Sequence, residues 1–136
     1  QVERDAMLPR TPSEPPQPSN YAGLQASKTV IIGPGDHDVF GDGTVVVKPA
    51  PGHTPGHQVL YVKLARTGGV VLSGDLYHYP EERTLNRLPL ADASQEGTQR
   101  SREALDTFLV RTGAQLWIQH DLTAHAKLRK APQYYE

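Results

Sequence analysis

PGHTPGH, at residues 51–57, decides the fold of this chain: two prolines, two glycines and two histidines come shortly after an expected strand at 44–48. Proline fixes its backbone angle and glycine permits tight turns, so this composition predicts a rigid, well-defined loop. A rigid loop suits a metal ligand, because the ligand is ordered before the metal arrives. Neutral imidazole binds zinc at a distance of about 2.1 Å. An isolated Pro-Gly-His is more often a surface turn; the full string favours a metal site.

Two further groups with metal-binding chemistry close apolar runs. Ser73-Gly74-Asp75 follows the run at 70–72, and His120-Asp121 follows the run at 116–118. A carboxylate can bridge two cations through its two oxygens. Taken singly, the aspartate reads as a turn or capping residue and the histidine as a core residue. Because all three groups close β-runs, we expect the strand ends to deliver them to one edge of a sheet.

The rest of the chain predicts several strands, one helix and a final strand. Two strands, at 39–40 and 44–47, are expected to form a hairpin around Gly41-Asp42-Gly43. A further strand is expected at 70–72, after a turn at Gly68-Gly69. The remaining expected strands lie at 29–32, 58–64 and 115–118. A helix is expected to begin after the N-cap Ser94 and to stop at Gly113. Residues 80–93 lack periodicity and predict an irregular segment, and the polar stretch after 121 is expected to be peripheral.

The start of the chain is rich in proline, unlike the residues after it. TPSEPPQPS at 11–19 carries four prolines in nine residues, a density that resists both helix and central strand. We therefore divide the chain into a lead-in loop or linker at 1–27 and a structured unit at 28–136.

Composition excludes several classes of protein. The 136 residues are 37% hydrophobic, and 14 basic against 15 acidic side chains leave a net charge of -1, which argues against nucleic acid or an anionic membrane as a partner. No apolar run approaches the ~18 residues that span a bilayer. Cysteine is absent, so histidines and carboxylates must hold any metal. The compartment stays undecided between cytoplasm and periplasm for a soluble protein.

In this order, the PGHTPGH, SGD and HD motifs resemble the C-terminal half of the metallo-β-lactamase superfamily, from about Asp36 to Asp121. Within it the chain looks most like the N-acyl homoserine lactonase branch, the quorum-quenching hydrolases, through GHTPGHQ and the closing HD with its short polar tail. The resemblance implies an α+β fold: the C-terminal half of an αββα sandwich, mostly strands with one or two helices.

The same resemblance implies a centre with two Zn²⁺ ions. His53 corresponds to a ligand of the first metal, Asp75 to the carboxylate that bridges both metals, and His120 to a ligand of the second. His57 corresponds to a residue that makes a hydrogen bond near the site rather than to a ligand.

Asp75, His78 and Tyr77 are the candidate catalytic residues. In the lactonases a tyrosine shortly after the bridging aspartate contacts the substrate carbonyl, and here that position is His78, with Tyr77 and Tyr79 on either side. The sequence departs from the family pattern at this point, so it leaves open which of the three rings contacts the substrate.

The family's HxHxDH motif does not occur in this chain, where His37 is the only histidine before the loop. Three ligands shared between two metals complete neither site, since a catalytic zinc has three protein ligands and a water. We therefore expect a complementary N-terminal half, whether cut off, unresolved or on another chain, and we expect this fragment to be inactive alone.

With both halves present, the resemblance implies a hydrolase that opens a small lactone or related ester with metal-bound hydroxide. A β-lactamase, a thioesterase and a phosphodiesterase are alternatives on the same ligands. A non-catalytic fragment or a partner-binding subunit is an alternative of another class, as is a metal-independent β-domain with chance histidines. A homo-oligomer stays open as well.

Overall fold

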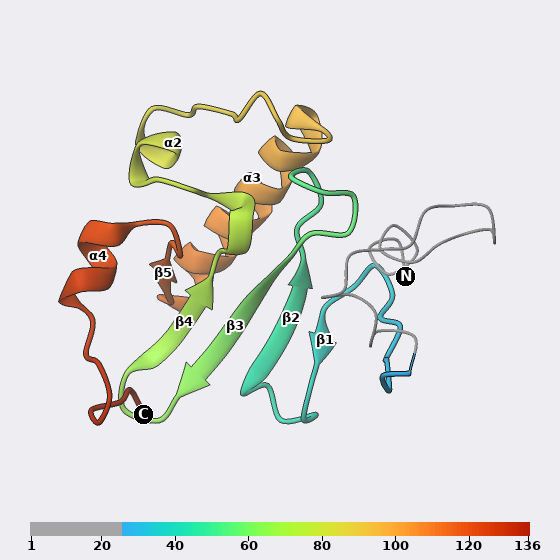
Figure 1. Cartoon of the computed structure of the whole chain (residues 1–136). Helices are drawn as coiled ribbons and strands as arrows, with labels where there is room; N and C mark the ends of the chain where they lie inside the picture. Colours follow the sequence, from blue (N-terminus) through green and yellow to red (C-terminus); the bar gives the residue numbers. More distant parts are fainter. Residues whose placement is uncertain (1–25) are drawn as a thin grey trace.

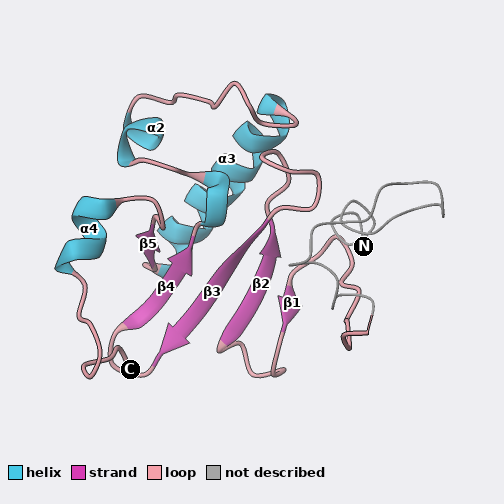
Figure 2. Ribbon diagram, in the orientation of Figure 1, coloured by secondary structure: helices cyan, strands magenta, loops and turns pink. Residues whose placement is uncertain are grey.

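The computed structural model of the chain describes residues 26–136, which form one five-stranded sheet with helices beside it (Figures 1 and 2). The strands lie in sequence order across the sheet: β1 (His37–Asp38), β2 (Val45–Pro49), β3 (Gln58–Leu64), β4 (Gly68–Leu72) and β5 (Gln115–Trp117). Neighbours from β1 to β4 are antiparallel, whereas β5 is parallel to β4. β2, β4 and β5 therefore run in the same direction, and their C-terminal ends meet at the same edge of the sheet.

The predicted hairpin is present, with a first strand two residues earlier than expected. β1 is His37–Asp38 rather than 39–40, and Asp38 pairs with Val46. The Asp38 carboxylate accepts hydrogen bonds from the backbone N–H groups of Gly41 and Gly43, which ties the turn to the strand and leaves Val39–Phe40 inside the turn. Turn chemistry therefore decides the strand end, and β-propensity does not.

Three other local predictions are wrong. Residues 29–32 form no strand, because none of the described strands pairs with them. The turn before β4 lies at 65–67, so that Gly68 and Gly69 belong to the strand; a side chain at Gly69 would meet Tyr61. The stretch 80–93, expected to be irregular throughout, contains the short helix α2 (Pro80–Thr84), and Pro80 is at its first position, where proline is tolerated.

The long helix is confirmed with both of its ends. α3 (Gln95–Thr112) begins after Ser94, whose side chain accepts from the Gly97 N–H, and it ends at Gly113, which has a φ of 67°. The last helix, α4 (Leu122–Lys127), lies in the stretch that was expected to be polar and peripheral, and its residues are largely exposed.

One face of the sheet packs on α3. In Figure 1, α3 lies behind β3 and β4. The core between these layers contains the following side chains: Ala50, Val59, Val71, Leu76, Tyr77, Leu105 and Leu109, with Tyr61, Phe108, Ala114, Leu116 and Ile118 partly buried against them. This packing holds β3 and β4, and the residues that follow β4, against Leu105 and Leu109 of α3.

The second face carries an apolar row in register across four strands. Val47 pairs with Leu60, Leu60 with Leu72, and Leu72 with Trp117, so these side chains project to the side away from α3. Tyr135 from the C-terminal tail packs edge-on against Trp117 with ring centroids 4.9 Å apart. None of the described helices crosses this face in Figure 1.

The helices of residues 26–136 are all too short or too polar to cross a membrane.

These elements confirm the predicted α+β class, a sheet with few helices. The proposed lead-in lies almost wholly outside the described residues, so the boundary at 27/28 and the linker at 11–19 stay predictions.

Candidate metal centre

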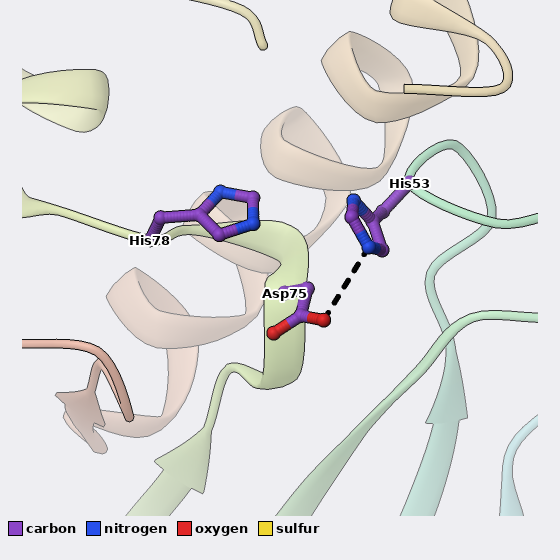
Figure 3. A group of neighbouring side chains, drawn as sticks. All are labelled: His53, Asp75 and His78. Carbon is purple, nitrogen blue, oxygen red and sulfur yellow. Dashed lines mark ion pairs between the residues drawn. The ribbon is translucent and has the colours of Figure 1, made fainter. Parts of the chain in front are cut away.

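Four side chains with metal-binding chemistry meet at the sheet edge where β2, β4 and β5 end. His53 lies in the loop after β2, Asp75 in the 3-10 turn η2 (Gly74–Leu76) after β4, and His120 in the turn after β5. His78 lies two residues after the end of η2. Figure 3 shows His53, Asp75 and His78 turned toward one another. The common direction of the three strands explains why residues far apart in sequence converge here.

The Asp75 carboxylate has a histidine at each of its oxygens. His53 Nε2 lies 3.3 Å from Oδ2, and His120 Nε2 lies 2.8 Å from Oδ1. The hydrogen bond from His120 holds the pKa of the Asp75 carboxyl below its ordinary value, and the field of His53 acts in the same direction against partial burial. An ionised carboxylate with one imidazole on either side has the arrangement of a group that can bridge two cations.

His78 lies between the other two imidazoles. Its ring centroid is 5.3 Å from that of His53 and 5.4 Å from that of His120, against which it stacks. One ligand atom each from His53, Asp75 and His78 lies within 4.8 Å of the other two. The three donors therefore surround a space of the size that a single cation occupies.

A buried carboxylate orients His53 from behind. His53 Nδ1 lies 3.0 Å from Asp92 Oδ1, and the Asp92 side chain is only 1% exposed. Thr98 in the first turn of α3 donates its hydroxyl to the other Asp92 oxygen at 2.7 Å. Since a carboxylate accepts, Nδ1 donates to Asp92, and Nε2 is the nitrogen left to face the cluster, where it would be the one to bind a metal. This carboxylate–histidine pairing is typical of metal-ligating histidines.

Backbone packing holds the same loop in place. Gly52 has a φ of 149°, and a side chain there would lie 2.2 Å from the backbone nitrogen of Thr98. The Ser101 hydroxyl donates to the Pro51 carbonyl, and the Ala93 N–H donates to the His53 carbonyl. The PGHTPGH loop is thus attached directly to the start of α3.

His78 has a second carboxylate behind it. His78 Nδ1 lies 3.2 Å from Glu82 Oε1, and the His78 N–H donates to Glu82 Oε2 at 3.0 Å. Arg102 of α3 also donates to Oε2 at 2.8 Å, and its remaining N–H groups reach the carbonyls of Leu76 and Arg87. Arg102 is buried, and each of its three guanidinium nitrogens donates a hydrogen bond, so Glu82 is held at a defined point between helix and turn.

His57 makes the hydrogen bonds expected of a positioning residue. Its Nε2 accepts from the Asp75 N–H at 2.9 Å, and its Nδ1 donates to the Ala50 carbonyl at 3.1 Å. A side chain at Gly74 would come within 2.8 Å of the same Nε2. His57 therefore couples the loop after β2 to the turn that carries Asp75, as the sequence predicted.

The structure does not bring Tyr77 to the cluster. Its ring is 1% exposed, belongs to the core against α3 and stacks on the Arg102 guanidinium at 4.3 Å. Burial raises the pKa of the phenol. Tyr79 is exposed, with its ring centroid 6.4 Å from that of His78. Of the three rings considered for substrate contact, His78 is the one that faces Asp75.

Sequence reasoning missed Asp92, Glu82 and Arg102. The two acids lie in the stretch at 80–93, where no motif or periodicity marks them. Arg102 occupies the buried side of an amphipathic helix, where a sequence pattern predicts an apolar residue.

The donor set fits a borderline-soft divalent metal. Imidazole nitrogens and one carboxylate, without thiolates, are ligands that zinc accepts. In a tetrahedral zinc site with ligand distances of about 2.0–2.1 Å, neighbouring ligand atoms lie about 3.3–3.4 Å apart. The 3.3 Å between His53 Nε2 and Asp75 Oδ2 already matches that separation.

Sequence comparison gives related proteins of the same kind. The sequence model of the Metallo-beta-lactamase superfamily matches residues 3–112. The N-acyl homoserine lactonase AttM of Azorhizobium caulinodans is 39% identical over 100 residues, covering 74% of this chain and 38% of that protein. The AttM lactonase of Rhizobium johnstonii is 37% identical over 99 residues, covering 73% of this chain and 38% of that protein.

A solved structure agrees with the sequence matches. An N-acyl homoserine lactone hydrolase with N-hexanoyl-L-homoserine bound at its catalytic metal centre superposes with a TM-score of 0.80 at 25% identity, covering all of this chain and 50% of that one. The chain thus spans 38% of the length of these curated relatives and half of the solved structure. The resemblance drawn from PGHTPGH, SGD and HD is confirmed, and so is the sandwich type of the fold: the chain belongs to the metallo-β-lactamase superfamily.

Proposed function

We propose that this chain carries part of the catalytic centre of a zinc-dependent hydrolase that opens N-acyl homoserine lactones. The observation that carries the proposal is the Asp75 carboxylate with one histidine at each oxygen, at an edge where three strands end. The lactonase relatives support the choice of substrate class.

Each ligand has a role in this proposal. His53 would hold one Zn²⁺ and His120 the other, and Asp75, which contacts both histidines in the structure, would be a ligand of both metals. Zinc bound there supplies a Lewis acid for the carbonyl and lowers the pKa of water toward neutrality. We assign to the Asp75 carboxylate the proton transfer to the oxygen of the leaving alcohol.

Asp75 and His78 are the catalytic residues that the proposal retains. His78 lies beside Asp75 in the cluster, whereas the buried position of Tyr77 gives it no access to a substrate there. We therefore leave Tyr77 out of the catalytic centre.

The centre needs ligands from elsewhere. We propose that a complementary segment with an HxHxDH motif supplies them, on the same protein or on a second chain. The apolar row Val47, Leu60, Leu72 and Trp117 on the face away from α3 supports this, since a second layer there completes the αββα sandwich.

The test is hydrolysis by this chain combined with its complementary segment and Zn²⁺, measured on four substrate classes: an N-acyl homoserine lactone, a β-lactam, a thioester and a phosphodiester. We expect the lactone to be opened fastest. Asp75→Ala should lower that rate at least ~1,000-fold, because the bridging carboxylate and its proton transfer are lost together. A preference for another class, or lactone opening that survives Asp75→Ala, would overturn the proposal.

A further inference from the structure

We propose that His78 is itself a metal ligand, and that His53, Asp75 and His78 bind one divalent cation using this chain alone. The site departs from the ligand set that the family resemblance implies, which pairs His53 and Asp75 with His120 and places a substrate-contacting residue at position 78. The inference goes beyond the proposed function, because a cation bound by these three residues requires no lactone chemistry.

Geometry is the first support. The three ligand atoms lie within 4.8 Å of one another, and the closest pair, His53 Nε2 and Asp75 Oδ2, is 3.3 Å apart. A tetrahedral zinc with bonds of about 2.0–2.1 Å needs separations of about 3.3–3.4 Å. To bind zinc, the three ligand atoms would close from within 4.8 Å of one another to that separation, and a water would take the fourth position.

The carboxylates behind the rings are the second and stronger support. His53 and His78 each direct Nδ1 to a carboxylate, Asp92 in one case and Glu82 in the other. Such a partner fixes the tautomer with hydrogen on Nδ1 and increases the basicity of Nε2, the nitrogen left for the metal. The same arrangement therefore stands behind both rings of the proposed site.

His120 differs from both. Among the hydrogen bonds of residues 26–136, its one partner is Asp75 itself, through Nε2, and its side chain is 51% exposed. No carboxylate of the described residues orients its Nδ1. The structure therefore prepares two histidines as ligands, and His78 is one of them.

Charge and access agree with this assignment. Two neutral imidazoles and one carboxylate leave a bound divalent cation with a net charge of +1, and the Glu82 charge behind His78 is paired with Arg102. The side chains of His53, Asp75 and His78 are 25%, 43% and 23% exposed. A cation can therefore reach them from solvent without unfolding of the loop.

The first experiment is a Zn²⁺ titration of the 136-residue chain by calorimetry, in competition with a chelator of known affinity. We expect one equivalent to bind tightly. His78→Asn should lower that affinity by about 100-fold, because the Asn amide can still donate to Glu82 in place of Nδ1 but offers no Nε2. His120→Asn should cost about tenfold less than His78→Asn, and His125→Asn, in α4 and outside the cluster, should cost nothing measurable.

A second measurement needs no variant. The ¹⁵N chemical shifts of the imidazole nitrogens in the labelled wild-type chain report which nitrogen coordinates metal. On adding one equivalent of Zn²⁺, Nε2 of His53 and of His78 should shift together, while the rings of His37 and His125 stay unchanged. This result is obtained even if His78→Asn fails to fold.

Three outcomes would overturn the inference: no binding of Zn²⁺ to the chain, an unshifted His78 Nε2, or an affinity that depends on His120 and not on His78. None of them refutes lactone hydrolysis by the complete centre. The opposite result is also informative. If one equivalent of Zn²⁺ binds through His78 but the completed enzyme opens no lactone, the proposed function is wrong and the metal site proposed here stands.

Discussion

The loop that carries His53 and the turn that carries His120 contribute to the same cluster, but they are built differently. The 51–57 loop is attached to α3 by backbone and side-chain hydrogen bonds, and a buried carboxylate orients its histidine. The turn at 118–121 is more exposed, and His120 is held by its contact with Asp75. One side of the centre is therefore organised before any metal arrives, and the other depends on its partner within the cluster.

α3 accounts for this difference. Its first two turns supply Thr98 to Asp92, Ser101 to the Pro51 carbonyl and Arg102 to Glu82. No described residue of α3 makes a hydrogen bond with the turn at 118–121. The same helix that completes the hydrophobic core thus also fixes the ligands on one side of the site.

The largest effect should follow from removing Arg102. Arg102→Leu leaves the Glu82 carboxylate without its cation and two carbonyls without a donor, so we expect a loss of about 3–5 kcal/mol in the free energy of unfolding. Urea unfolding followed by the fluorescence of Trp117, the only tryptophan, measures it. The double variant Arg102→Leu with Glu82→Leu should recover part of the loss. A loss below about 1 kcal/mol for the single variant would show that this network does not anchor the site.

Gly52→Ala should break the attachment of the 51–57 loop to α3. The new Cβ would lie 2.2 Å from the Thr98 nitrogen at a φ of 149°, so the loop or the helix must shift. We expect a loss of about 2–4 kcal/mol together with weaker zinc binding. Gly35→Ala is the matched control, since nothing lies within 4 Å of its Cβ position. Equal stabilities of the two variants would contradict the contact.

Asp92→Asn tests whether the buried carboxylate behind His53 strengthens zinc binding by that histidine. The change keeps the size of the side chain but removes the charge that orients His53 Nδ1, so we expect the affinity for Zn²⁺ to fall by about 10- to 100-fold. Asp106→Asn, an exposed aspartate paired with Arg83, is the control and should leave the affinity unchanged. Both variants are measured by the same competition titration. An unchanged affinity in Asp92→Asn would mean that the pairing is structural only.

The smallest effects should come from the helix caps on the two sides. Ser94→Ala removes the N-cap of α3 and should cost about 1 kcal/mol in unfolding free energy. Asp121→Ala removes the equivalent cap of α4, a short and exposed helix, and should cost less than half as much because α4 contributes little to the core. Thermal unfolding followed by circular dichroism compares the two variants. A larger loss of unfolding free energy in Asp121→Ala than in Ser94→Ala would contradict the expectation that α3 is the more important of the two helices for stability.

Local signals in the sequence predicted the elements where chemistry and periodicity agree. β3 and α3 have the predicted bounds, because an alternating strand and a capped amphipathic helix each carry their own start and stop. The run at 29–32 fails for the opposite reason: it is β-branched but finds no partner among the described strands. A strand needs a neighbour, and sequence propensity does not supply one.

Some of the candidate site residues were predictable from sequence motifs, and for others only the folded structure shows where the side chain lies. His53, Asp75 and His120 were predicted from motifs at the ends of β-runs, and the strand directions bring them together. Tyr77 and His78 are neighbours in sequence, yet one is in the core and the other faces the cluster. The backbone at Tyr77 is extended, with φ of -137° and ψ of 128°, so neighbouring side chains point to opposite sides, and the packing of Tyr77 in the core leaves His78 facing the cluster.

The sequence by itself determined the family and the order of most of the strands and of the long helix, and it predicted His53, Asp75 and His120 as donors, because motif residues carry their chemistry wherever the chain places them. Only the tertiary structure decided which of the donor histidines have a carboxylate behind them that orients the ring. Asp92 behind His53 and the Glu82–Arg102 pair behind His78 join segments that no local rule connects. Hydrogen bonds between distant segments depend on where packing places α3 against the sheet, and that placement exists only once the core has formed.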